Sequence, residues 1–174
     1  MNNAELRSAL LSITALSSDY CAMLENAREM EKDEFVAGVL GLLPRIYFEF
    51  SDLSADEHMS EPGYGYFQSY VDEDFYESVR RNVEMVLGPD DVFLETFEED
   101  MKYSDTPIAA SISECLADIF QPLYNFICVV KESEGEQSLE AYAECRENFV
   151  AYWSQTLCNV MRALNHLRFN PTTE

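Results

Sequence analysis

Apolar side chains recur at alternating steps of four and three residues in the first part of the chain, and this spacing most constrains the fold. Over residues 4–29 the repeating positions are Leu6, Leu10, Ile13, Ser17, Tyr20, Leu24 and Ala27. Such steps place side chains on one face of an α-helix, with Ser17 as a single polar break. The pattern predicts an amphipathic helix. No stretch of the chain shows the apolar–polar alternation that is typical of a strand.

The second predicted helix, over residues 34–53, is the most apolar part of the chain. It follows Asp33, a plausible N-cap residue, and its middle is apolar almost all round, which is typical of a buried helix. Gly38 and Gly41 would let a neighbouring helix approach closely. Pro44 removes one backbone hydrogen bond, so we expect it to kink or split this helix.

Further helices follow from the same periodicity and from helix start and stop signals. A third begins after the capping residue Asp72 and ends at Gly88-Pro89, and residues 90–106 are predicted to hold a short helical turn. Thr106-Pro107 is predicted to start the fifth helix, because a capping hydroxyl precedes a proline at the first helical position. Residues 137–168 are predicted to form one last helix, with Trp153 on its buried face. The expected fold is all-α, with residues 1–174 in a single-domain bundle of about six helices.

The charge balance excludes several classes of partner. The chain has 33 Asp and Glu residues against 11 Lys and Arg residues, for a net charge of −22. Binding to nucleic acid depends on Lys and Arg at the phosphates, and docking on anionic membranes depends on the same residues. We therefore expect no nucleic acid and no membrane as partner.

The cysteines and the N-terminal residues indicate the cytoplasm. The five cysteines are odd in number and form no Cys-x-x-Cys pair, so we expect reduced thiols that are buried as small apolar side chains. The first residues lack a basic segment followed by an apolar one, so we expect no signal peptide there. The longest nearly apolar stretch, residues 35–43, is too short to span a membrane.

A set of carboxylates shares one side of the predicted fifth helix. Ser111, Glu114, Asp118 and Asn125 are spaced by three, four and seven residues. A second set, Glu144, Glu147 and Asn148, could come from the last helix, and facing carboxylates of helical bundles can bind metal ions. The other interpretations are a solvated face, which we favour, and a structural hydrogen-bond network. We predict no cofactor, and Glu114, Asp118, Glu144 and Glu147 are the candidate metal ligands if a metal is bound.

The most acidic stretch runs from Asp90 to Asp105. It lacks the central glycine that a calcium-binding loop requires. We interpret it as a solvated connector, with a docking surface for a basic partner as the alternative.

A long connection at residues 54–71 carries the aromatic residues Tyr64, Tyr66, Phe67 and Tyr70. Loops of this length are usually functional or disordered, and tyrosine is enriched at binding surfaces. These four residues are the candidate partner contact. The competing interpretation is that they fold back and cover the core of the bundle.

Two motifs resemble those of an uncharacterised protein family. They are the stretch from Tyr103 to Ile119 (YSDTPIAASISECLADI) and Glu147-Asn148-Phe149 followed by Tyr152-Trp153. Both are similar to the signature of an all-helical domain of unknown function, found mainly in Bacteroides-type bacteria. The resemblance covers nearly the whole chain. It implies a bacterial origin and an all-α fold, and it brings no activity, substrate or catalytic residue.

These observations leave three functional hypotheses. The leading one is a non-enzymatic, acidic interaction domain that binds a protein partner, with a basic partner as one option. The alternative is a metal-dependent hydrolase of a nucleotide or phosphate compound that uses the helix-borne carboxylates. The third, an inhibitor that mimics DNA, rests only on the acidic excess.

Overall fold

The chain folds into a helical bundle, as its apolar periodicity predicts. The computed structural model describes residues 2–52, 67–95, 102–103 and 106–170. Its α-helices are α1 (Asn3–Glu25), α2 (Lys32–Asp52), α3 (Glu73–Leu87), α4 (Ile112–Glu132), α5 (Ser138–Asn148) and α6 (Ser154–Phe169). Asn2 caps α1 and Asp72 caps α3 through side-chain oxygens, and Gly88 ends α3 with a positive φ of 56°. The prediction of an all-α bundle of about six helices is confirmed.

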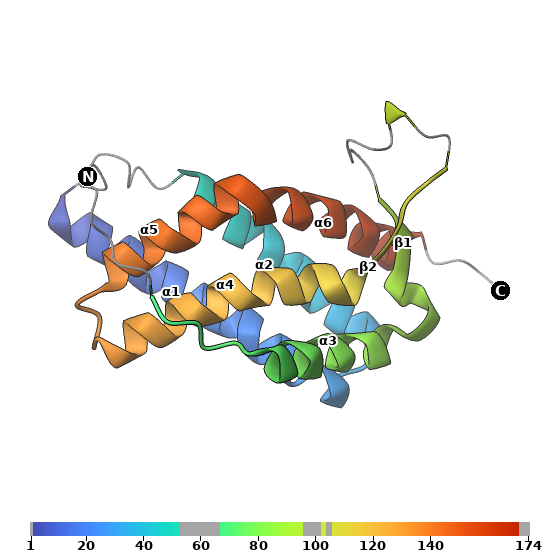
Figure 1. Cartoon of the computed structure of the whole chain (residues 1–174), viewed down its shortest axis with the longest axis horizontal. Coiled ribbons are helices and arrows are strands. Elements are labelled where there is room, and N and C mark those ends of the chain that lie inside the picture. Colours follow the sequence, from blue (N-terminus) through green and yellow to red (C-terminus); the bar gives the residue numbers. More distant parts are fainter. Residues whose placement is uncertain (1, 53–66, 96–101, 104–105, 171–174) are drawn as a thin grey trace.

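Helix α4 is at the centre of this bundle. It packs against α1, α3, α5 and α6, while α2 lies against α1 and α6 (Figure 1). The hydroxyl of Tyr20, fully buried on α1, donates a hydrogen bond of 2.8 Å to the carbonyl oxygen of Leu116 on α4. This bond satisfies a polar group that would otherwise destabilise the core, so it fixes α1 against α4.

Helix α2 differs from its prediction in how much of it is buried. It runs from Lys32 to Asp52 through Pro44 as one helix, so of the two outcomes expected at this proline, splitting does not occur. Tyr47 and Phe48 are exposed, so α2 buries one broad face and the prediction that it is buried all round is wrong. The expected close approach occurs at Gly38, where a Cβ atom would lie 2.9 Å from the side chain of Met23 on α1. A Cβ atom at Gly41 would meet nothing within 4 Å.

Two further predictions concern membranes and thiols. Among the described residues, no helix combines the length and apolar character that a bilayer span requires. All five cysteines are free thiols. Cys158 is exposed, and here the expectation of a buried thiol is wrong.

A small β-ribbon replaces the predicted start of the fifth helix. Residues 88–91 form a 3₁₀ turn, after which β1 (Val92–Leu94) pairs antiparallel with β2 (Ala109–Ser111). Helix α4 therefore begins at Ile112, five residues after Pro107, with Ser111 as its N-cap. The prediction of a helix start at Thr106-Pro107 is wrong, because residues 109–111 pair with β1 instead. The ribbon projects from one end of the bundle (Figure 1).

The residues predicted as the last helix form a continuous helical segment, but its type of helix changes along the chain. Residues 149–153 form a π-helical turn between α5 and α6, and such turns are frequently found at functional sites. Trp153 lies at the end of this turn, 3% exposed, and packs edge-on against Phe50 and Phe149. Its indole N–H donates to the carbonyl oxygen of Cys145 at 3.3 Å. The prediction that Trp153 is buried is confirmed.

Trp153→Ala is expected to lower the free energy of unfolding by about 3–5 kcal/mol, because it removes a large buried ring and leaves a cavity. Urea denaturation followed by circular dichroism measures this change. Tyr152→Ala is the matched control, since its neighbouring ring is 74% exposed. Equal losses of stability in the two variants would contradict the role of Trp153 in the core.

Candidate functional site

The ribbon is attached to α4 through the buried side chain of Asp91. One carboxylate oxygen accepts the backbone N–H of Ser113 at 2.7 Å. The other accepts the hydroxyl of Ser113 at 2.7 Å and that of Ser111 at 3.2 Å. A carboxylate at the N-terminus of a helix is stabilised by free N–H groups and by the helix dipole. Asp91 therefore fixes the start of β1 against the first turn of α4.

Glu95 extends this junction to α6. Its backbone N–H donates to the carbonyl oxygen of Ile108 at 2.8 Å, which continues the ribbon by one step beyond Leu94. Its side chain is buried and accepts a hydrogen bond from the amide of Asn159 on α6. The ribbon is thus held to both α4 and α6.

A cleft lies between α4 and the segment formed by the π-helical turn and α6. It has a volume of about 510 Å³ and contains the carboxylates of Glu95 and Asp118. The described residues that line it include no Lys, Arg or His. The others are Cys115, Val150, Ala151, Tyr152, Ser154, Gln155, Thr156 and Asn159. We refer to this space as the acidic cleft.

The second carboxylate of the cleft, Asp118, is held by α3. The hydroxyl of Tyr76 donates to it at 2.7 Å. Partial burial in the cleft raises the pKa of Asp118, and the hydrogen bond from Tyr76 opposes this rise. Burial also raises the pKa of Tyr76, so its hydroxyl remains a donor at neutral pH. A cation in the cleft would be attracted to the ionised carboxylate and would lower its pKa.

The thiol of Cys115 lies in the same cleft. Burial raises its pKa to about 12, and the neighbouring carboxylates, Glu95 foremost, add to the rise. At neutral pH the group is therefore a thiol, and the thiolate is the form that acts as a nucleophile or binds a metal. The electrostatics of the cleft favour the binding of a cation over nucleophilic chemistry.

The four candidate metal ligands lie in different places. Asp118 lines the acidic cleft, whereas Glu144 lines a separate pocket of about 270 Å³ between α4, α5 and residues 67–69. Glu114 is an exposed residue in the first turn of α4, and Glu147 is exposed near the end of α5. Across the described part of the chain, no three His, Cys, Asp or Glu side chains are grouped so that they could hold a metal ion.

The polar side of α4 contacts neighbouring segments at three of its four positions. The hydroxyl of Ser111 donates to Asp91, Asp118 accepts from Tyr76, and Asn125 accepts the backbone N–H of Tyr70 at 2.8 Å. These contacts match the hydrogen-bond network that was one of the alternatives from sequence.

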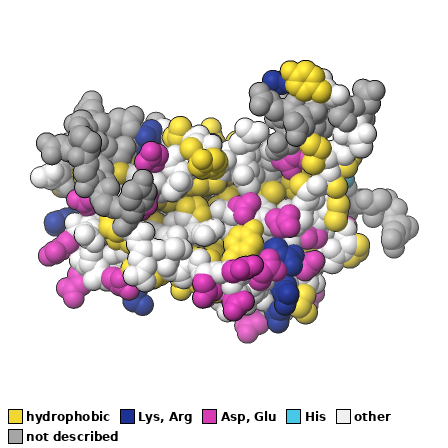
Figure 2. Space-filling model, in the orientation of Figure 1, with side chains coloured by type: hydrophobic (Ala, Val, Ile, Leu, Met, Phe, Trp, Pro, Cys, Tyr) yellow, Lys and Arg dark blue, Asp and Glu magenta, His cyan; other side chains and the backbone are white. Residues whose placement is uncertain are grey.

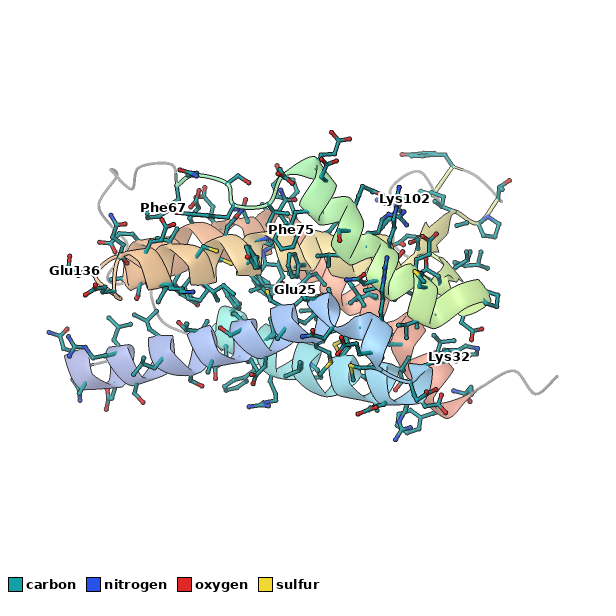
Figure 3. All side chains as sticks on the ribbon, turned by 90° about the horizontal axis from the view of Figure 1, so that it is seen from below. Glu25, Lys32, Phe67, Phe75, Lys102 and Glu136 are labelled. Carbon is teal, nitrogen blue, oxygen red and sulfur yellow. The ribbon has the colours of Figure 1, made fainter. Side chains whose placement is uncertain are left out.

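The aromatic loop is described only in part. Tyr64 and Tyr66 lie outside the described residues, so their predicted contact stays a prediction. Phe67 packs on the core beside α4 (Figure 3). The hydroxyl of Tyr70 donates to the carboxylate of Glu132 at the end of α4. These two aromatic residues lie against the bundle.

Sequence reasoning missed Asp91, Glu95 and Asn159. The first two belong to the acidic stretch that was interpreted as solvated, and here that interpretation is wrong because both side chains are buried and hydrogen-bonded. The available signal was the apolar run Val92-Phe93-Leu94 between them, which indicates a segment that packs. Asn159 gives no comparable signal.

Comparison with known proteins identifies one family and a similar solved structure. A family described as a domain of unknown function (DUF5063) matches residues 5–170. The crystal structure of protein BF1032 from Bacteroides fragilis is similar over 95% of this chain and 96% of that chain, with 30% identity and a TM-score of 0.79. The comparison with curated proteins gives no match.

Asp118→Asn is expected to raise the melting temperature at pH 7. Because the folded state raises the pKa of Asp118, ionisation of this group opposes folding. This free-energy penalty is absent below the pKa of about 3.9 that the group has in the unfolded chain. It grows as the pH rises from there to the higher pKa of the folded state. The gain in the variant should therefore shrink towards zero as the pH is lowered to 4 or below. Asparagine still accepts the Tyr76 hydrogen bond.

Thermal denaturation between pH 3.5 and pH 8 measures this dependence. Glu31→Gln removes the same charge from an exposed turn and controls for net charge. A melting temperature of Asp118→Asn that falls below that of the wild type at pH 7 would contradict the electrostatic account of the cleft.

Proposed function

The chain belongs to the DUF5063 family, and we propose that it is a non-enzymatic interaction domain that binds a basic protein partner through the acidic cleft. The partner would insert a Lys or Arg side chain between α4 and α6, next to Asp118. This proposal refines the sequence-based hypothesis by assigning the contact to the cleft. The aromatic loop remains a second candidate contact.

The observation that carries the proposal is the lining of the acidic cleft. Two carboxylates face a space of about 510 Å³, and no described lining residue is positively charged. The exposed ring of Tyr152 lies at the same site, and tyrosine and exposed apolar side chains are typical of protein contacts. An alkylammonium or guanidinium group would reduce the unfavourable ionisation of Asp118 and could also contact the Tyr152 ring.

The surface around the cleft is also rich in negative charge, which supports a basic partner. Carboxylates are numerous over α3 and the first half of α4 (Figure 2). With a net charge of −22, the molecule attracts basic partners at long range and speeds their association. The surface field would act on the rate of association, and the cleft would provide the specific contact.

The hydrolase alternative has less support. Asp118 and Glu144, which it would combine, line different pockets. The lining of the acidic cleft also offers no cationic side chain to a phosphate group, which the two carboxylates would repel.

We also place the protein in the cytoplasm of a bacterium. A solved structure that resembles it comes from Bacteroides fragilis. Five free cysteines fit a reducing compartment, in which thiols persist without pairing.

An affinity pull-down with quantitative mass spectrometry tests the proposed function. The wild type and two double variants are used as bait. Glu114→Gln with Asp118→Asn removes one cleft carboxylate and the exposed carboxylate one turn before it on α4. Glu29→Gln with Glu31→Gln removes the same charge from an exposed turn between α1 and α2. We expect a basic protein that the wild type and the turn variant retain equally. The cleft variant should retain it at least about tenfold less, because a charge contact is lost.

The salt dependence of retention tests whether the contact is electrostatic. Raising NaCl from 0.05 M to 0.5 M should weaken retention by the wild type and by the turn variant in parallel. Equal retention by all three baits, or a captured protein without basic character, would contradict the proposal.

A further inference from the structure

A second cavity lies between β1 and the C-terminal half of α6, farther along α6 than the acidic cleft. Its volume is about 290 Å³, and its apolar lining includes Phe93, Ile112 and Leu167. Arg162 and His166 of α6 also line it. We refer to it as the ribbon groove, and the ends of β1 and α6 lie side by side there (Figure 1).

The charge at this groove is opposite to that of the rest of the molecule. Residues 148–173 contain no Asp or Glu, in a chain that has 33 of them. Arg162 and His166 are four residues apart, so they share one side of α6. Within the described residues, Arg162 forms no ion pair.

The one acidic residue in the lining is already neutralised. Asp90 accepts a hydrogen bond from Lys32 at the start of α2, with 2.6 Å between Nζ and the carboxylate oxygen. An anion in the groove would therefore meet the Arg162 guanidinium and the His166 imidazole beside a neutral pair. No other cavity described above has a lysine, arginine or histidine in its described lining.

We propose that the ribbon groove binds an organic carboxylate with a short apolar group. The apolar group lies on Phe93, Ile112 and Leu167, and the carboxylate accepts hydrogen bonds from Arg162 and His166. A planar guanidinium matches the two oxygens of a carboxylate, so Arg162 provides the main polar contact. A few polar groups over an apolar surface are the usual composition of a ligand site.

The size of the groove limits the ligand. A volume of about 290 Å³ is at the low end for small-molecule sites, so it accommodates one short alkyl chain or one aromatic ring. Two sources share this chemistry. One is a free short-chain or aryl carboxylic acid, and the other is the C-terminal carboxylate of an apolar peptide.

This inference goes beyond the proposed function and does not depend on it. The acidic cleft and the ribbon groove have opposite charge preferences and share only Asn159 in their linings. Variants that test the groove leave Asn159, Glu95 and Asp118 unchanged. The proposal for the groove can therefore be contradicted while the proposal for the cleft holds. The reverse outcome can be distinguished in the same way.

Chemical-shift titration of the ¹⁵N-labelled full chain tests the proposal. The probes are hexanoate and 3-phenylpropanoate, each compared with its neutral amide, and an N-acetylated Ala-Val-Leu peptide with a free or an amidated C-terminus. Arg162→Gln removes the main contact. Arg45→Gln, at an exposed position of α2, is the matched control for charge.

We expect at least one free carboxylate to shift the amide signals of Phe93 and Leu167 in the wild type and in Arg45→Gln. Binding should weaken about tenfold or more in Arg162→Gln and for the matching amide. Binding of the acids but not the peptide identifies a free small molecule as the source, and the reverse identifies a peptide terminus.

Three results would overturn the proposal. They are equal binding of a carboxylate and its amide, equal binding by the two arginine variants, and no binding of any probe at millimolar concentration. Circular dichroism melts of both variants verify that each is folded, so a loss of binding is assigned to the removed side chain.

Discussion

The buried carboxylate of Asp91 is the contact on which the ribbon end of this molecule depends. It accepts the backbone N–H and the hydroxyl of Ser113 together with the hydroxyl of Ser111, so it fixes the start of β1 to the first turn of α4. Four residues later the chain reaches Glu95, which binds Asn159 on α6. The acidic cleft contains Glu95, and the ribbon groove is lined by β1. Both cavities therefore depend on a ribbon that is held against α4 and α6, and an unpaired buried carboxylate at this point would be strongly destabilising.

Separation of charge along the chain gives the two cavities different chemistry. The acidic residues end at Glu147 and return only at the last position, so α6 carries Arg162 and His166 without a nearby acid in sequence. The cleft between α6 and α4 takes its carboxylates from α4 and from the residue after β1. The groove between α6 and β1 is lined by Arg162 and His166 of α6. Helix α6 thus borders a site suited to a cation along its first turns and a site suited to an anion along its later turns. This arrangement is consistent with a binding protein that contacts two chemically different groups.

Most of the fold could be predicted from the sequence, because helix periodicity and capping are local signals. The caps at Asp72 and Gly88 and the burial of Trp153 follow from residues close in the chain. The ribbon could not be predicted in this way, because β1 and β2 have only three residues each and pair across a gap in the sequence. The paired residues are 15 to 19 positions apart, from Leu94 with Ala109 to Val92 with Ser111. The local start signal at Thr106-Pro107 was overridden by this tertiary contact. For the site, the sequence indicated Asp118 but not its partner Tyr76 on α3, and burial of Asp91 and Glu95 arises only when the ribbon packs.

Amide hydrogen exchange in the wild type and in Asp91→Ala tests most directly whether this carboxylate holds the ribbon. In the wild type, the amides of Ser113 and Glu95 should both be protected, since they donate to Asp91 and to Ile108. In Asp91→Ala, both should exchange faster together, while amides in the middle of α1 and α2 keep the protection of the intact bundle. Unchanged protection of the Glu95 amide in the variant would contradict the account, because the ribbon would then be held in place without Asp91.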